Sequence, residues 1–195
     1  MMAWLDRVKT CFRWDKADRA RIAELCSWLD SDVSNIVESL ARQLEQLKGV
    51  QPLMSNARFV WRLHTVLHEW LTGLLNGTFD GQYARERWAF GQKLMGADLT
   101  FEDIIMLGGV VRNQFFELAR ERLEGRPEEL SATMHTLDKA LDLDLTLIYS
   151  GYRQVHDAEM ERALLDRFLS ITGFSRTLYE NLAEARERKQ VARYQ

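Results

Sequence analysis

The sequence predicts an all-α protein. Only two of its 195 residues are proline, and 46% are hydrophobic against 28% charged, a balance typical of a folded globular chain. Hydrophobic residues recur at steps of three and four along most of the chain, which is the period of an amphipathic helix. The length suits one domain followed by a connecting segment.

Two helices are expected early in the chain, over residues 19–28 and 33–47. Gly49 and Pro52 should interrupt the pattern after them, because glycine favours helix termination and proline disfavours helix in the preceding residue. The next helix is expected to begin near Asn56, a residue type that caps helix starts.

The middle of the chain contains three further boundaries. The helix that begins near Asn56 should end at Asn76-Gly77, and another should pass through Tyr83 and end after Leu94. Thr100 with Asp103 three residues later has the pattern of a capping box at the start of a long helix.

That long helix contains the pair Gly108-Gly109, which we expect to allow close packing of backbones. Gly125 and Pro127 separate it from the last helix, which should run from Glu128 to at least Gln154.

The last helix is hydrophobic on more than one side, so it needs two packing partners. One is the core of the domain, and the second is expected to be the same helix pair of another subunit; a central helix of a monomer is the alternative. The residues expected at this homodimer interface are Gly108, Val111, Phe115, Leu137, Leu141, Leu145, Ile148 and Tyr152.

Beyond His156 the hydrophobic spacing alternates between four and three residues, which predicts a short coiled coil. Its expected seam is Leu164, Phe168, Ile171, Ser175, Leu178, Leu182 and Ala185.

Several functional classes lack support in the sequence. The net charge of −3 offers no footprint for nucleic acid, and no segment has the length and hydrophobicity of a membrane span or secretory signal. Asp138 and Asp142 are expected on a solvated helix face, and no nucleophile stands beside a base. We therefore expect a cytoplasmic protein that is not an enzyme and that binds no metal.

The segment from Trp70 to Asp80, followed by Tyr83, Arg87 and Gly91, resembles the middle of globin-coupled sensors and protoglobins. Parts of the last helix and the segment around Trp14 are also similar to that family, so the likeness covers about residues 14–154. It implies a globin fold with an extra N-terminal helix over residues 1–157. Residues 158–195 would then be a helical linker to an output domain, such as a kinase or cyclase, of a bacterial signalling protein.

The resemblance also implies where haem would bind. In the family a histidine three residues after the glycine ligates the iron, and here that position is Leu94. The distal tyrosine position falls on Ala41. Because leucine has no lone pair for iron, we expect no cofactor. The former pocket, kept open or filled, would be lined by Leu40, Leu63, Leu67, Phe90 and Leu94.

Two alternatives remain open. His64 and His68 share a helix face and could supply a substitute ligand in a haem-binding gas sensor. The chain could also be a purely structural dimerisation module with a filled interior.

Overall fold

A computed structural model of the chain describes residues 2–29, 33–45, 51–94, 100–179 and 181. The fold is all-α. Its helices are α1 (Met2–Cys11), α2 (Lys16–Leu29), α3 (Val33–Glu45), α4 (Gln51–Met54), α5 (Ala57–Leu75), α6 (Gly81–Leu94), α7 (Phe101–Arg122) and α8 (Pro127–Thr172).

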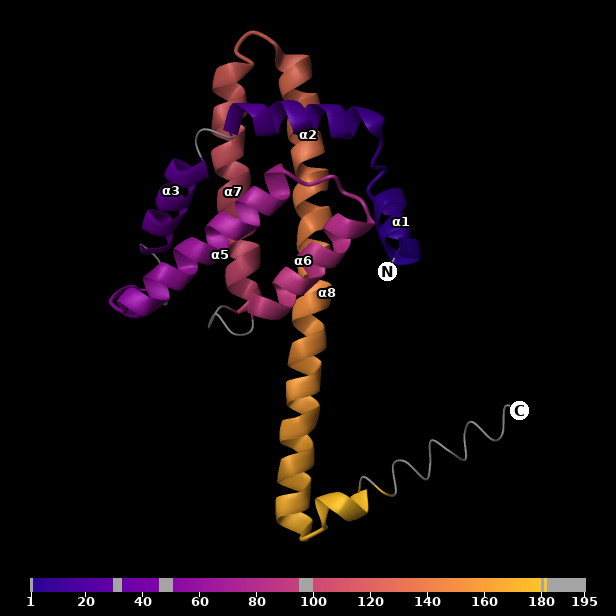
Figure 1. Ribbon diagram of the computed structural model, residues 1–195. Coiled ribbons are helices and arrows are strands. Elements are labelled where there is room, and N and C mark those ends of the chain that lie inside the picture. Colours follow the sequence, from indigo (N-terminus) through magenta and orange to yellow (C-terminus); the bar gives the residue numbers. More distant parts are fainter. Residues whose placement is uncertain (1, 30–32, 46–50, 95–99, 180, 182–195) are drawn as a thin grey trace, which may run out of the picture. The chain divides into compact units, whose positions relative to one another are not determined.

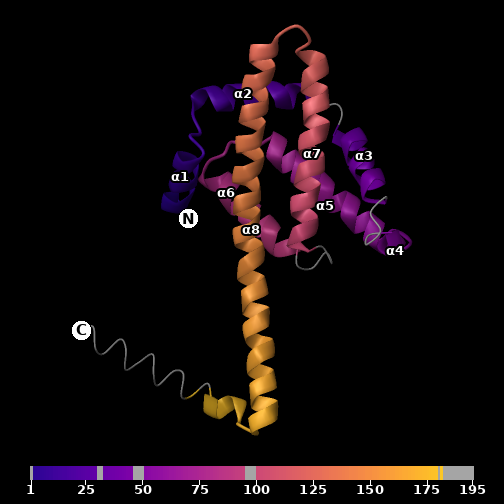
Figure 2. The same ribbon diagram turned by 180° about the vertical axis from the view of Figure 1, so that it is seen from behind.

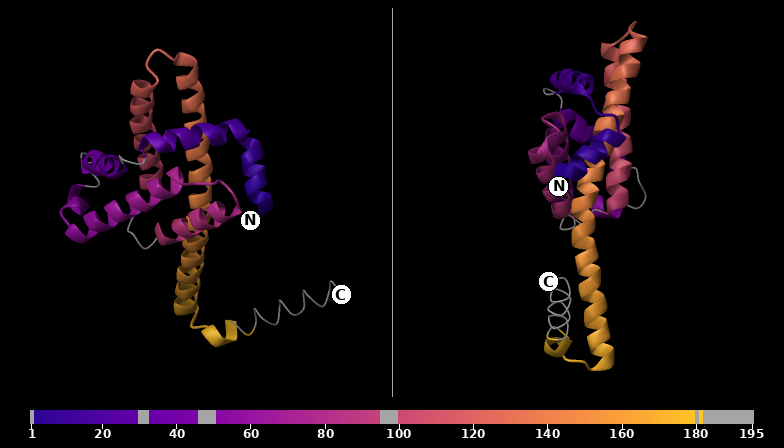
Figure 3. Two further views of the ribbon diagram at one scale, coloured as in Figure 1. Left: turned by 45° about the horizontal axis from the view of Figure 1, so that its top comes forward. Right: turned by 90° about the vertical axis from the view of Figure 1, so that its right-hand side faces the viewer.

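Residues Met1–Gln154 form one compact unit, which contains α1 to α7 and the first part of α8. In this unit α7 and α8 are antiparallel neighbours, and α2, α5 and α6 lie across them (Figures 1 and 2). Figure 3 shows α2, α5 and α6 on the same side of the α7–α8 pair. Helix α3 packs against both α5 and α7. This two-layer arrangement is the globin fold.

Helix starts are determined by local hydrogen bonds, as the sequence predicts. The side-chain oxygen of Asn56 accepts hydrogen bonds from the backbone N–H groups of Arg58 and Phe59, at 3.0 and 3.4 Å. Thr100 and Asp103 form a reciprocal capping box at the start of α7. Pro127 is the first residue of α8, where its missing N–H has no intrahelical acceptor to lose.

Two helices differ from the sequence-based expectation. The hydrophobic spacing did not predict helix α1, although the family resemblance implies an extra N-terminal helix; α1 buries Leu5, which is 1% exposed, in the core. The expected break around Pro52 is only partly correct, because Pro52 is the second residue of the short helix α4. Proline is tolerated there because the N–H groups of a first helical turn have no acceptor within the helix.

Glycines permit an unusually close crossing of α6 and α8. A β-carbon on Gly91 would lie 2.0 Å from the carbonyl oxygen of Ile148, and one on Gly151 would lie 1.9 Å from that of Trp88. The two backbones are therefore in direct contact, and only glycine fits at either position.

The close backbone packing expected at Gly108-Gly109 is not found at either residue. A β-carbon on Gly108 would meet the side chain of Leu145 on α8 at 3.0 Å, whereas one on Gly109 would meet nothing within 4 Å. Gly109 thus lies on the open side of α7.

Residues Val155–Gln195 form a second unit. Within it α8 continues to Thr172, and Gly173, with a φ angle of 68°, ends the helix. The expected coiled-coil seam is therefore not one continuous helix, because the break after Thr172 separates Ile171 from Leu178. Leu182 and Ala185 of that seam lie outside the described residues.

No described helix is both long and apolar enough to cross a membrane.

Candidate functional site

The five side chains expected around a haem lie together in the interior of the first unit. Leu40 comes from α3, Leu63 and Leu67 from α5, and Phe90 and Leu94 from α6. All five belong to one hydrophobic cluster, and each is at most 4% exposed. Ala41, at the expected distal position, is also 4% exposed.

These exposures bear on whether haem fits. Side chains that pack closely against one another leave almost no surface that a water-sized sphere can touch. Leu40 and Leu67 are 0% exposed and Leu63 and Leu94 are 1% exposed. These four leucines are therefore closely packed within the hydrophobic cluster.

Among the described residues, this interior contains no histidine at the expected position of the iron ligand. Leu94 is the last residue of α6, and none of the four histidines belongs to the hydrophobic core. His64 is half-buried, whereas His68, His135 and His156 are exposed. Leu94 and its closely packed neighbours thus present hydrocarbon side chains where the family resemblance places the iron ligand.

A buried ion pair lies beside this closely packed interior, and the sequence analysis did not find it. Asp144 of α8 is 0% exposed and Arg87 of α6 is 3% exposed. Arg87 donates from Nε to Asp144 Oδ1 at 2.7 Å and from Nη2 to Oδ2 at 3.1 Å. A buried charge needs such a partner, because transfer from water costs several kcal/mol per ion by rough estimates.

Two aromatic side chains complete this network. Trp70 of α5 donates from Nε1 to Asp144 Oδ2 at 2.7 Å, and the Tyr83 hydroxyl donates to Asp144 Oδ1. Arg87 Nη2 also donates to the carbonyl oxygen of Trp70 at 3.2 Å. One carboxylate of α8 thus holds α5 and α6 together.

The network alters the titration of its members. Burial, reinforced by the neighbouring charge of Asp144, raises the pKa of the Tyr83 hydroxyl well above its usual value, so the tyrosine stays a neutral donor. Burial lowers the pKa of Arg87, but the attraction of Asp144 outweighs it and raises the pKa overall.

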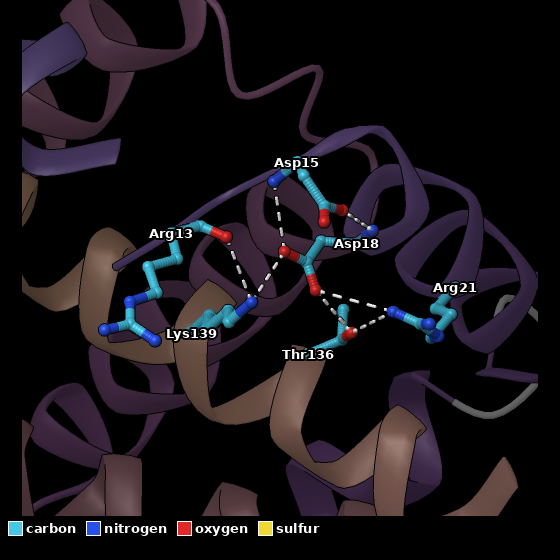
Figure 4. A network of polar contacts seen from close by, with 6 residues as sticks. All are labelled: Arg13, Asp15, Asp18, Arg21, Thr136 and Lys139. Carbon is cyan, nitrogen blue, oxygen red and sulfur yellow. Dashed lines mark hydrogen bonds and ion pairs between the residues drawn. The ribbon is translucent and has the colours of Figure 1, made fainter. Parts of the chain in front are cut away.

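A second polar cluster joins α2 to α8 (Figure 4). Asp18, which is 1% exposed, accepts hydrogen bonds from Thr136 at 2.8 Å and from Lys139 Nζ at 2.9 Å. Asp15 and Asp18 also accept hydrogen bonds from each other's backbone N–H groups at the start of α2. Burial alone would raise the pKa of Asp18. The hydrogen bonds from Lys139 and Thr136 together outweigh this effect, so the pKa lies below its usual value.

His64 and His68 lie outside the core, in an open groove between α5 and α6 of about 770 Å³. Trp61 and Phe90 contribute aromatic rings to this α5–α6 groove, and the buried Arg87 also lines it. The structure therefore brings the two histidines together, as expected from their spacing, in a groove that Phe90 lines and Leu94 does not. No group of three metal-binding side chains is found among the described residues.

The residues expected at a dimer interface are mostly internal, which corrects that assignment. Val111, Phe115, Leu137, Leu141 and Ile148 are each 0% exposed and pack in the core of their own chain, and Gly108 is buried. Leu145 and Tyr152 are partly buried against the same core. These side chains cannot form the contact surface for a second copy while they fill the interior.

Other residues of α7 and α8 remain on the surface. Ile105 and Phe116 of α7 are 53% and 39% exposed, and Tyr149 of α8 is 40% exposed. Between them Arg112 forms ion pairs with Asp138 and Asp142, at 2.7 and 2.8 Å. The two aspartates therefore lie on a partly solvated face, as expected.

Comparison with known proteins agrees with this geometry. The family model described as protoglobin matches residues 1–158. The globin domain of a globin-coupled sensor from Geobacter sulfurreducens has a similar structure, with a TM-score of 0.66, 17% sequence identity, and coverage of 76% of this chain and 97% of that domain. Among curated proteins, none matched the chain. The chain therefore belongs to the protoglobin family and has the fold of a sensor globin domain.

Proposed function

We propose that this chain is a non-haem sensor globin domain of a bacterial signalling protein, which dimerises and relays a signal along α8 to an output domain. The observation that carries the proposal is Leu94, a side chain with no lone pair, at the position where the family resemblance places the iron ligand. The close packing around Leu94, which is 1% exposed, supports the same conclusion. Any catalysis would belong to the output domain.

Reconstitution with haem tests the missing cofactor. The purified chain is titrated with haemin, and the absorbance of the Soret band is followed. We expect well under one tightly bound haem per chain and the same spectrum for native protein and for His64→Ala/His68→Ala. One haem per chain with a sharp Soret band would refute the proposal.

The α5–α6 groove favours one alternative, a gas sensor in which His64 or His68 ligates haem outside the core. Both histidines line that groove, whose volume of about 770 Å³ could hold a large ligand. In that case the Soret band would disappear in His64→Ala/His68→Ala and persist in His135→Ala, because His135 is an exposed histidine on α8 that does not line the groove.

Dimerisation is proposed through the exposed side of α7 and α8. Ile105, Phe116 and Tyr149 are large hydrophobic side chains on the outside of a helix pair, and residues of this kind commonly mark protein–protein contacts. In the second unit Leu164, Phe168 and Ile171 are 49–74% exposed and could pair with the same helix of a second copy.

Sedimentation equilibrium tests the interface. Phe116→Glu should shift the protein from dimer to monomer, because a buried unpaired carboxylate opposes association, while the thermal unfolding of the monomer changes little. Trp61→Ser is the matched control, since Trp61 is 67% exposed on α5, and it should leave the oligomeric state unchanged. If the native protein is already a monomer, the proposal that the domain dimerises is contradicted.

A further inference from the structure

We propose that the α5–α6 groove binds a small aromatic carboxylate, with Arg87 Nη1 as the donor to the carboxylate and Trp61 and Phe90 as walls for the ring. Within the proposed function this molecule would be the ligand that the domain senses. The binding itself, however, depends only on the groove and not on the dimer or the output domain.

The first observation is an unused donor on a buried cation. Arg87 is 3% exposed, and its Nε and Nη2 atoms donate to Asp144 and to the carbonyl oxygen of Trp70. Among the described residues Nη1 has no hydrogen-bond acceptor. Because a guanidinium has five N–H donors and Nη1 borders the groove, this atom can donate to water or to a ligand that enters the groove.

Gly73 leaves this donor uncovered on the groove side. A β-carbon at position 73 would lie 2.1 Å from Arg87 Nη1, so any side chain there would occupy the space next to the donor. Gly73 and Arg87 both line the groove. The groove therefore has an N–H donor of a positively charged group next to the bare α-carbon of Gly73.

The acidic side chains of the groove already have partners. Glu69 forms an ion pair with Lys93 at 2.7 Å, and Glu86 accepts a hydrogen bond from Gln82 Nε2 at 3.0 Å. Neither carboxylate accepts a hydrogen bond from Nη1, although the charge of Glu69 attracts the Arg87 guanidinium. A carboxylate is the strongest acceptor for this donor, because hydrogen bonds between ionised partners are about twice as strong as neutral ones.

The aromatic side chains that line the groove indicate that the ligand also carries a ring. The Phe90 ring lies beneath the guanidinium, 4.9 Å from Arg87 Cζ to the ring centroid, and the largely exposed indole of Trp61 also lines the groove. Aromatic walls with a few polar groups are typical of small-molecule sites of roughly 300–1,000 Å³. His64 and His68 add polar ring nitrogens on the α5 side.

Fluorine NMR of the full chain tests this site with 4-fluorobenzoate as the probe and 4-fluorobenzamide as its neutral counterpart. We expect saturable binding of the acid, and binding of the amide at least about tenfold weaker, a difference of about 1.4 kcal/mol. Gly73→Ala should weaken binding of the acid about tenfold or more, because the new β-carbon covers Nη1. His135→Ala, away from the groove, should bind as the native protein does.

Trp61→Ser provides a variant that does not depend on the core, because Trp61 is 67% exposed, and it should also weaken binding. No saturable binding, equal binding of acid and amide, or native affinity in both Gly73→Ala and Trp61→Ser would overturn the proposal. If Gly73→Ala does not fold, the comparison of acid with amide and the binding measured for Trp61→Ser decide whether the groove binds the carboxylate. Sedimentation and haemin titration of the same sample test the proposed function separately. If the protein is a haem-free dimer that does not bind the probe, only the proposal of ligand binding in the groove is refuted.

Discussion

Replacing Asp144 by asparagine should destabilise the protein far more than its single lost charge suggests. Four hydrogen bonds converge on this carboxylate, from Trp70 Nε1, the Tyr83 hydroxyl, and Nε and Nη2 of Arg87. An asparagine side chain has the same shape but only one acceptor oxygen. Its NH2 group would therefore face at least one of these donors, and the charge of Arg87 would be buried without a counter-charge.

The magnitude follows from the burial of the pair. Removing one partner of a buried ion pair costs about 3–5 kcal/mol, whereas a domain has about 5–15 kcal/mol of stability in total. Asp144→Asn should thus remove at least about a fifth of the free energy of unfolding, and more in a domain of average stability. Asp142→Asn is the matched control on the same helix. Its carboxylate is 49% exposed and pairs with Arg112, and such surface pairs contribute about 1 kcal/mol or less.

Urea unfolding at neutral pH, followed by far-ultraviolet circular dichroism, measures both variants. The double variant Arg87→Met/Asp144→Asn should be more stable than Asp144→Asn alone, because the methionine removes the uncompensated charge while the asparagine oxygen still accepts from Trp70 or Tyr83. The reasoning is refuted if Asp144→Asn costs no more than Asp142→Asn, or if the Arg87→Met and Asp144→Asn costs simply add.

Four other substitutions give distinct expectations. Gly91→Ala should cost about 3 kcal/mol or more in urea unfolding, because its β-carbon meets a backbone carbonyl at 2.0 Å, whereas Gly109→Ala, in open space, should stabilise the monomer by about 0.5–1 kcal/mol. Asp18→Asn should cost about 2 kcal/mol at neutral pH. Since the folded pKa of Asp18 lies below its usual value of 3.8, this deficit should stay constant above about pH 5 and narrow as the pH falls below 3.8; a pH-independent deficit would contradict it. Tyr83→Phe should cost about 2 kcal/mol. The difference in free energy of unfolding between Tyr83→Phe and the native protein should narrow only above pH 10.0, because there the unfolded tyrosine ionises and the folded one does not. Urea unfolding repeated across this pH range measures the difference.

Helix boundaries were predictable from the sequence wherever a short-range hydrogen bond defines them. Asn56, the Thr100–Asp103 capping box and Pro127 all begin helices at the positions expected from their residue types. The fold class and the similarity to sensor globins were predictable for a related reason. The three- and four-residue hydrophobic spacing and the Trp70–Asp80 segment are properties of consecutive residues.

The prediction from hydrophobic spacing was wrong where a single residue ends a helix within a longer repeating pattern. The seven-residue spacing continues across Gly173, but the φ angle of 68° at that glycine ends α8. Short helices were also difficult to find, because α4 is only four residues long and contains Pro52.

Which hydrophobic face is inside, and which charge is buried, was decided only by the tertiary structure. Periodicity shows that α7 and α8 are hydrophobic on several sides, but it does not show that Val111 and Ile148 fill the core while Ile105 and Phe116 stay exposed. Asp144 stands two residues from the solvated Asp142, and only the packing of α5 and α6 against α8 makes one a buried acceptor and the other a surface ion. The physical reason is that helix formation depends on neighbours within four residues, whereas desolvation depends on side chains 57 to 74 positions away along the chain.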